Sequence, residues 1–167
     1  MLRIVEAYSE LNMEQYLHLC RESIQQSGWE KYRHLSPKTQ VQNAKDDLVG
    51  YLSGGFFWKK GAFCALWVED DTYKSALRIE PYRDGVLLHA LETDPRARRQ
   101  GYAFNLVQGV LSYLRDKNQA LVYSHIHKWN ISSKCLHEKC GFEIIADSAV
   151  LLDETVTQSY YTMVKKL

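Results

Sequence analysis

The residues from Val86 to Arg115 constrain the fold of this 167-residue chain more than any other stretch. They begin with a nearly continuous apolar run from Val86 to Leu91, which turns polar at Glu92 and continues into a basic segment that contains Gly101. Apolar residues then recur at the three- and four-residue spacing of one helix face: Ala103, Leu106, Val107, Val110, Leu111 and Leu114. The pattern predicts a buried strand, a tight turn and an amphipathic helix.

The turn between this strand and helix has the features of an anion site. The first N–H groups of a helix lack acceptors within the helix, and the positive end of the helix dipole lies beside them. Arg96, Arg98 and Arg99 add positive potential, and Gly101 has no Cβ to keep a ligand away from the backbone. The turn therefore favours a phosphate or pyrophosphate ligand. The alternative is an ordinary strand-to-helix connection that binds nothing.

Two segments resemble the GNAT superfamily of acyl-CoA N-acyltransferases. Residues 98–103, with the sequence RRQGYA, resemble that family's R/Q-x-x-G-x-G/A pyrophosphate loop, with Ala103 in place of the second glycine. Residues 130–142 resemble its second motif, N-x-x-S-x-x-L-Y-x-x-x-G-F, at the usual separation from the first. Either motif alone is weak, but the two in order are fairly specific. The strand segment His89-Ala90-Leu91 is most similar to the arylalkylamine N-acetyltransferases.

The resemblance implies the GNAT fold, an α+β fold with a mixed, mostly antiparallel central sheet and helices on both faces. It also implies that two central parallel strands splay apart to admit acetyl-CoA, which serves as a co-substrate. The backbone of Leu91 and Thr93 would pair with the pantetheine arm. The other implied cofactor contacts are Arg98, Arg99, Gln100, Gly101, Tyr102, Ala103, Asn130 and Ser133. Without the resemblance, Asn130 and Ser133 are as well explained by the start of a helix.

His89 and Glu92 are the two candidates for the base that removes a proton from an amine. Imidazole is suited to this step near neutral pH, and the matching histidine of the arylalkylamine enzymes helps to relay the proton. Strand alternation places His89 on the face of Leu91 and Thr93, and Glu92 on the opposite face. The alternatives are a core histidine and a solvent-facing carboxylate.

His137 stands where the family's motif carries a tyrosine that usually protonates the departing CoA thiolate. We expect either that His137 supplies this proton or that the thiolate leaves unaided. A histidine on the helix surface is the alternative. The same departure leaves open a catalytically idle protein that only senses acyl-CoA.

A further alternative is a Cys/His metal-binding interaction module. Its candidate ligands lie within 16 residues, and such side chains ligate zinc: His125, His127, Cys135, His137 and Cys140. Their spacing matches no standard zinc finger, and we predict no metal site. The acceptor amine is not identified, although the loop that contains Trp29 and Tyr32 is the better aromatic candidate for covering its pocket.

Length and charge bound the remaining possibilities. The chain fits one domain over residues 1–167, and 21 basic against 20 acidic residues argue against a nucleic-acid partner. Four scattered cysteines and the lack of a long apolar run predict a cytoplasmic protein with reduced thiols and no membrane partner. The predicted partner is a small-molecule amine, and a homodimer is compatible with the sequence.

The flanking sequence predicts the remaining elements. Asn12, with Gln15 as its partner, should cap a helix that ends at Gly28, and Ser36-Pro37 should begin a second helix that ends at Gly54-Gly55. A further helix is expected over 132–140, and residues 56–58 are ambiguous. Strands are expected over 2–8, 62–68, 72–81, 120–123, 142–145 and 160–164.

Overall fold

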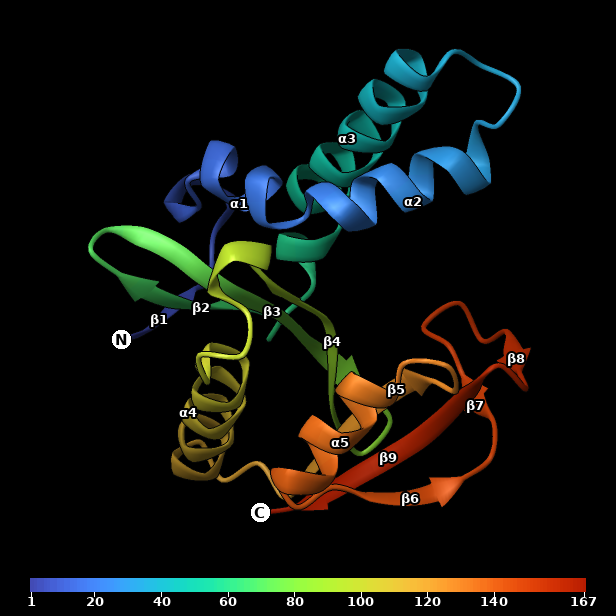
Figure 1. Cartoon of the computed structure of the whole chain (residues 1–167). Helices are drawn as coiled ribbons and strands as arrows, with labels where there is room; N and C mark the ends of the chain where they lie inside the picture. The colour runs from blue at the N-terminus through green and yellow to red at the C-terminus, as the bar shows by residue number, and fades with distance from the viewer.

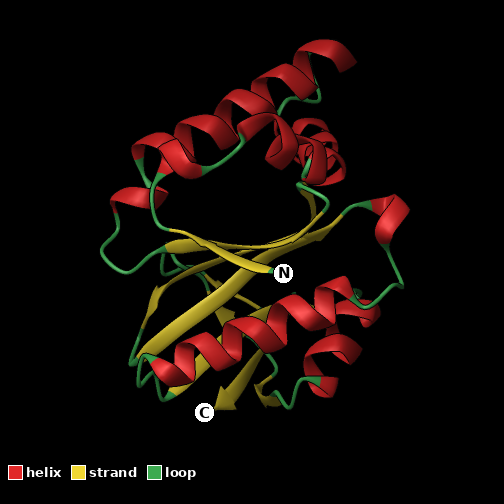
Figure 2. Ribbon diagram, turned by 90° about the vertical axis from the view of Figure 1, so that its left-hand side faces the viewer, coloured by secondary structure: helices red, strands yellow, loops and turns green.

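The computed structural model describes residues 1–167 and contains a seven-stranded sheet between two layers of helices (Figures 1 and 2). The strand order is β1-β2-β3-β4-β5-β9-β6, and β4 and β5 form the one parallel pair. This arrangement confirms the predicted mixed, mostly antiparallel sheet. The strands are β1 (Leu2–Val5), β2 (Phe63–Glu69), β3 (Thr72–Tyr82), β4 (Gly85–Thr93), β5 (Leu121–His127), β6 (Glu143–Ala146) and β9 (Tyr160–Lys166). A separate two-stranded ribbon, which the sequence did not predict, joins β7 (Ala149–Val150) and β8 (Val156–Thr157).

Helices cover both faces of the sheet, and each layer has its own core. One layer consists of α1 (Met13–Leu19), α2 (Arg21–Lys31) and α3 (Pro37–Gly54). Its core includes Tyr16, Leu52, Phe56 and Leu66. The other layer consists of α4 (Tyr102–Asp116) and α5 (Ile131–Lys139). The larger core lies on this side and includes the apolar stripe of α4 predicted from the sequence, apart from Ala103.

The helix starts follow the local signals, but one predicted helix end is wrong. The Asn12 side chain accepts the Gln15 N–H, and Ser36 caps α3 with Pro37 at its first position. The first predicted helix is in fact two helices, since the chain leaves helical geometry at Cys20 and resumes it in α2. Gly28 lies inside α2, where a Cβ would come within 2.7 Å of the Gln40 carbonyl oxygen. Glycine is required there because α2 and α3 pack closely, and not because the helix ends.

Two other local predictions need correction. The first strand ends at Val5, and residues 8–10 form a 3₁₀ turn instead of continuing it. Residues 56–58 also form a 3₁₀ turn, which buries Phe56 under α3. A third such turn, at residues 95–97, follows β4. None of the helices has both the length and the apolar character needed to cross a membrane.

Candidate active site

The two parallel strands separate partway along their length. β4 pairs with β5 only from Val86 to Leu88, opposite residues 122–124 of β5. β4 continues to Thr93 and β5 to His127, and no pairing between them is present beyond Leu88. The β5-facing edge of residues 89–93 therefore has no strand partner, which confirms the predicted splay.

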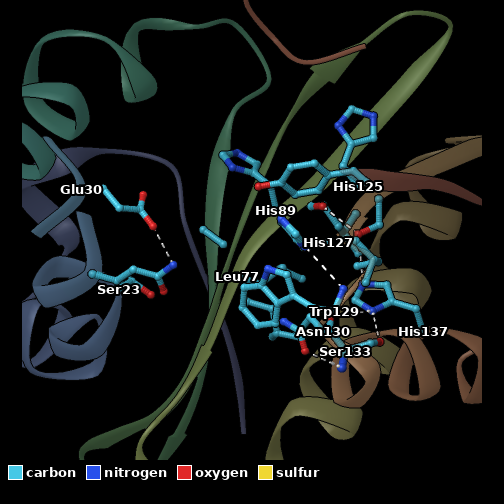
Figure 3. A pocket seen from close by; sticks show the side chains of 17 residues that line it. Ser23, Glu30, Leu77, His89, His125, His127, Trp129, Asn130, Ser133 and His137 are labelled. Atoms are coloured by element: carbon cyan, nitrogen blue, oxygen red, sulfur yellow. Dashed lines mark hydrogen bonds between the residues drawn. The ribbon is translucent and has the colours of Figure 1, made fainter. Parts of the chain in front are cut away.

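A cavity of about 490 Å³ lies at this splay (Figure 3). Ser23 and Glu30 of α2 lie on one side of it, and His137 of α5 lies on the other. The remaining polar and aromatic side chains come mostly from β5 and the segment that follows it: Ser124, His125, His127, Trp129, Asn130 and Tyr160. Residues 88–91 of β4 form its base.

A second cavity, of about 400 Å³, lies between β3–β4 and the helices α2 and α3. Its lining includes Tyr51, Arg78 and Glu92. The two cavities share Ser23, His89 and Ala90, so that they meet at the β4 residues where the splay begins. A side chain at position 89 is therefore accessible from both.

A β-bulge in β4 corrects the predicted orientation of its side chains. The pairing with β3 shifts register between His89 and Glu92, and Ala90 has a positive φ of 52°. Because a bulge inserts one extra residue, alternation is broken and the residues beyond it change face. Leu91 packs in the α4-side core, whereas His89 and Glu92 both line the α2–α3 cavity. His89 thus shares its face with Glu92 and not with Leu91.

His89 lies beside a buried carboxylate that the sequence reasoning missed. Its Nε2 is 2.8 Å from Oε1 of Glu80, which is fully buried. The contact has the distance of an ion pair, but Nε2 is closed off from solvent and lacks hydrogen-bond geometry. Glu80 also accepts the Tyr51 hydroxyl at 2.5 Å and contacts the Lys59 ammonium.

The pKa values of Glu80 and His89 are both lowered, but for different reasons. Burial alone would raise the pKa of Glu80, but the contacts with His89, Lys59 and Tyr51 outweigh it and hold the pKa at about 2. Burial lowers the pKa of His89 below its usual value, and Glu80 only partly opposes this shift. Near pH 7 the site thus holds a neutral imidazole against an ionised carboxylate, which is an arrangement suited to accepting a proton.

The environment of the Glu92 carboxylate differs from that of Glu80. Burial raises its pKa, and its carboxylate accepts a hydrogen bond from Ser23 on α2. Glu92 has no cation within ion-pair distance, although Arg78 and Arg98 lie close enough to oppose the rise in its pKa. It is therefore a cavity-lining carboxylate and not the solvent-facing one of the alternative interpretation.

The glycine turn has the backbone geometry of an anion site. Gly101 caps α4 in the left-handed region with φ 88°, and no side chain caps the free N–H groups of the first turn. A Cβ at Gly101 would meet nothing closer than 3.9 Å, so the space above the backbone is open. Arg99 is exposed, while Arg98 forms an ion pair with Glu22 of α2.

The second motif forms the start of α5. Asn130 caps the helix by accepting the Ser133 N–H at 3.1 Å. His137 is 2% exposed, with its Nδ1 2.8 Å from the Ser133 carbonyl and its Nε2 3.1 Å from the Ser124 hydroxyl. Because a carbonyl only accepts, Nδ1 carries a proton. Burial lowers the pKa of His137, so the ring is neutral near pH 7.

Comparison with known proteins identifies the family of this chain. The sequence model described as the acetyltransferase (GNAT) family matches residues 2–142. The chain belongs to the GNAT acetyltransferase family. It is therefore an acetyl-CoA-dependent acyltransferase, with the GNAT fold that the sequence resemblance implied.

Solved GNAT structures share the fold over nearly the whole chain at low sequence identity. The PaiA N-acetyltransferase of Thermoplasma acidophilum, in complex with coenzyme A, has a TM-score of 0.68 and 15% identity, covering 100% of this chain and 99% of that chain. A ribosomal-protein-alanine N-acetyltransferase of Brucella melitensis has a TM-score of 0.65 and 15% identity, covering 100% and 99%. An aminoglycoside 6'-acetyltransferase type Ii has a TM-score of 0.65 and 13% identity, covering 99% and 96%. A search of curated protein sequences gave no significant match.

The structure of this GNAT protein also tests the metal-binding alternative and the predicted aromatic cover of the acceptor pocket. No group of three or more His, Cys, Asp or Glu side chains is placed to hold a metal ion, so the five Cys and His residues of the metal hypothesis do not form a site. Trp29 and Tyr32, the predicted aromatic cover of the acceptor pocket, line neither cavity. Trp29 is 62% exposed, and the Tyr32 hydroxyl donates to Asp47.

The two charged residues of the site that the sequence reasoning missed, Arg78 and Glu80, lie on the same face of β3. They alternate with Leu77 and Ile79, which pack in the α4-side core. The available signal was this alternation of charge in a strand that lies inside the sheet. Both charged side chains lie under the α1–α3 layer, where Arg78 lines the second cavity and Glu80 is buried against Tyr51.

Proposed function

We propose that this protein is an N-acetyltransferase that transfers the acetyl group of acetyl-CoA to the primary amine of a small molecule, by direct attack in a ternary complex. The carrying observation is the pair of cavities that meet at His89. Their volumes of about 490 and 400 Å³ lie in the range typical of small-molecule pockets. One cavity lies at the splay of β4 and β5 and suits the acyl donor, and the other lies under α2 and α3 and suits the acceptor.

His89 is the proposed base. An amine is protonated near neutral pH and must lose a proton before it can attack an acyl carbon. Nε2 of His89 faces Glu80, so Nδ1 is the ring nitrogen left for the substrate proton. The ionised Glu80 stabilises the imidazolium that forms. Glu92, on the same face, is the rival base, and its raised pKa brings it closer to the working range of one.

Two backbone features and several side chains support the proposed donor contacts. The open edge of β4 supports backbone pairing at Leu91 and Thr93, and the uncapped first turn of α4 supports phosphate binding at Gly101, Tyr102 and Ala103. Arg99 and Gln100 are exposed beside this turn, and Arg98 would exchange Glu22 for a phosphate. Asn130 and Ser133 line the same cavity. Acetyl-CoA supplies the activated acetyl thioester, and residues of the chain bind it, orient it and accept the proton of the amine.

A panel of primary amines incubated with acetyl-CoA tests the proposal. We expect release of free CoA thiol that depends on one class of small amine, together with a product whose mass is increased by one acetyl group. A peptide panel with free N-termini serves as the comparison. If acetyl-CoA binds but no amine promotes thiol release, the protein is the acyl-CoA sensor. If only peptides are acetylated, the small-molecule assignment is wrong.

The surroundings of His137 allow a sharp test of whether this residue protonates the departing thiolate or the thiolate leaves unaided. Phenylalanine at this position would keep the ring contact with Phe142, which now has a centroid distance of 5.2 Å. The Ser124 hydroxyl would keep the Leu88 carbonyl, 3.1 Å away, as its acceptor. The substitution therefore removes the imidazole without leaving a buried polar group unpaired.

Because the ring is neutral near pH 7, we expect His137→Phe to lower kcat by less than about tenfold at that pH, well below the usual contribution of a general acid. Acetyl-CoA affinity should be unchanged, and the thiolate would then leave unaided. Stopped-flow measurement of the chemical step checks this. A loss of about 10²-fold or more, with an alkaline limb below pH 6.5 in the wild type that disappears in the variant, would establish the acid role.

A further inference from the structure

The floor of the α2–α3 cavity holds a cation without a counterion. Arg78 of β3 is half-buried and lines this cavity, and its Nε is closed off from solvent without a hydrogen-bond partner. None of the chain's ion pairs includes it. Its one specific contact is with the face of the Tyr51 ring, whose centroid is 5.4 Å from the guanidinium carbon.

No acidic group forms an ion pair with Arg78. Glu92 lies close enough for Arg78 to oppose the rise in its pKa, but not within ion-pair distance. Burial raises the pKa of Tyr16, and it raises the pKa of Cys20 and of Cys64 to about 12, so all three are uncharged near pH 7. Glu80, two residues along the same face, already contacts His89, Lys59 and Tyr51. A guanidinium that is partly removed from water and has no ion-pair or hydrogen-bond partner is costly, because buried charges are normally paired.

The position of Arg78 relates this cation to the reacting amine. Arg78 and His89 are directly opposite each other in the β3–β4 register, and both face the cavity. Cross-strand neighbours have Cβ atoms about 5 Å apart, so a single small molecule can reach both side chains. Glu92, beyond the bulge, adds a carboxylate to the same wall.

We propose that Arg78 binds a carboxylate of the acceptor, which makes the acceptor an amino acid or a closely similar amino-carboxylate. This inference rests on the proposed N-acetyltransferase function and specifies its substrate class. The planar guanidinium matches a carboxylate in bidentate geometry. The amine end then lies toward His89 and Glu92, where a positive charge is favoured until the proton is removed. Polyamines and aminoglycosides, which carry only positive charge, are disfavoured by the same guanidinium.

The test compares each amino acid with the amine that lacks its carboxylate, for example lysine with cadaverine, tyrosine with tyramine and tryptophan with tryptamine. We expect the wild type to acetylate the carboxylate-bearing member of the preferred pair with the higher kcat/KM. Arg78→Gln should lower that value about ten- to hundred-fold, the range expected for the loss of charge-assisted hydrogen bonds, and mainly through KM. The decarboxylated partner should be acetylated as well as before or better.

Two controls separate binding from folding. Arg115→Gln removes the same charge from the exposed face of α4 and should change neither member of the pair. Arg78→Gln breaks no hydrogen bond or ion pair and removes only the contact with the Tyr51 ring, so its Tm should stay close to that of the wild type. An equal loss for both members of a pair, or a wild-type preference for the decarboxylated amine, would overturn the inference.

A binding measurement that needs no turnover distinguishes failure of the acyl-transfer proposal from failure of the carboxylate inference. Calorimetric titration of the protein with the N-acetylated amino acids and with their carboxamides should show carboxylate-dependent binding in the wild type and its loss in Arg78→Gln. If no amine is acetylated but this binding is present, the carboxylate site stands and the proposed function fails. If acetylation proceeds without any carboxylate preference in rate or binding, the proposed function stands and this inference fails.

Discussion

Replacing Gly101 with glutamate is expected to abolish acetyl-CoA binding while the protein remains folded. Gly101 is exposed at the start of α4, and its missing side chain leaves open space over the free N–H groups. A carboxylate there would occupy that space and repel a pyrophosphate. One like-charge contact at about 4 Å costs about 4 kcal/mol at the effective dielectric constant of a protein surface, which corresponds to roughly 10²–10³-fold in affinity.

Isothermal titration calorimetry with acetyl-CoA measures this effect, and two variants isolate its cause. Gly101→Ala tests the backbone alone, since φ 88° is strained for any residue with a Cβ, and should weaken binding far less. Gly50→Glu places the same charge on the exposed face of α3, where a new side chain meets nothing within 4 Å, and should bind normally. Undiminished affinity in a folded Gly101→Glu variant would remove the pyrophosphate from this turn.

Removing the imidazole of His89 should cost about 10²–10⁴-fold in kcat/KM near pH 7, the range typical of a general base. Alanine leaves no group on this face of β4 that can take a proton, apart from Glu92. The loss should shrink as the pH approaches the pKa of the acceptor amine, because free amine then becomes abundant. The kcat/KM profile of the wild type should show an acidic limb below pH 6.5, the ordinary pKa of histidine, because burial lowers the pKa of His89.

Glu80→Gln is the matched variant for this mechanism. Loss of the carboxylate removes the charge that raises the pKa of His89, so the acidic limb should move to still lower pH. Its kcat should fall less than that of His89→Ala, because the base itself remains. If the limb instead persists in His89→Ala and disappears in Glu92→Gln, the base is Glu92, whose pKa lies above its ordinary value.

The local sequence of residues 86–115 determined the central strand–turn–helix unit. Short-range rules were enough because each feature depends on neighbours within a few residues, such as helix periodicity, a capping side chain or a missing Cβ. The order of strand, turn and helix was therefore predictable, whereas the GNAT fold and the proposed acetyl-CoA contacts were implied by the resemblance of residues 98–103 and 130–142 to that family. The end of α2 was not, because Gly28 serves the packing of α2 on α3.

The arrangement of the proposed acceptor side was decided by tertiary structure alone. Alternation along β4 predicted opposite faces for His89 and Glu92, and a single bulge at Ala90 placed them on one face. The partner of His89 is Glu80 of β3, and Glu80 in turn contacts Tyr51 of α3 and Lys59 of the turn after α3. Such pairings depend on strand register and on how a helix layer covers the sheet. Neither can be predicted from the spacing of residues along the chain. For the same reason, the uncompensated charge of Arg78 is visible only once the strands and helices are assembled.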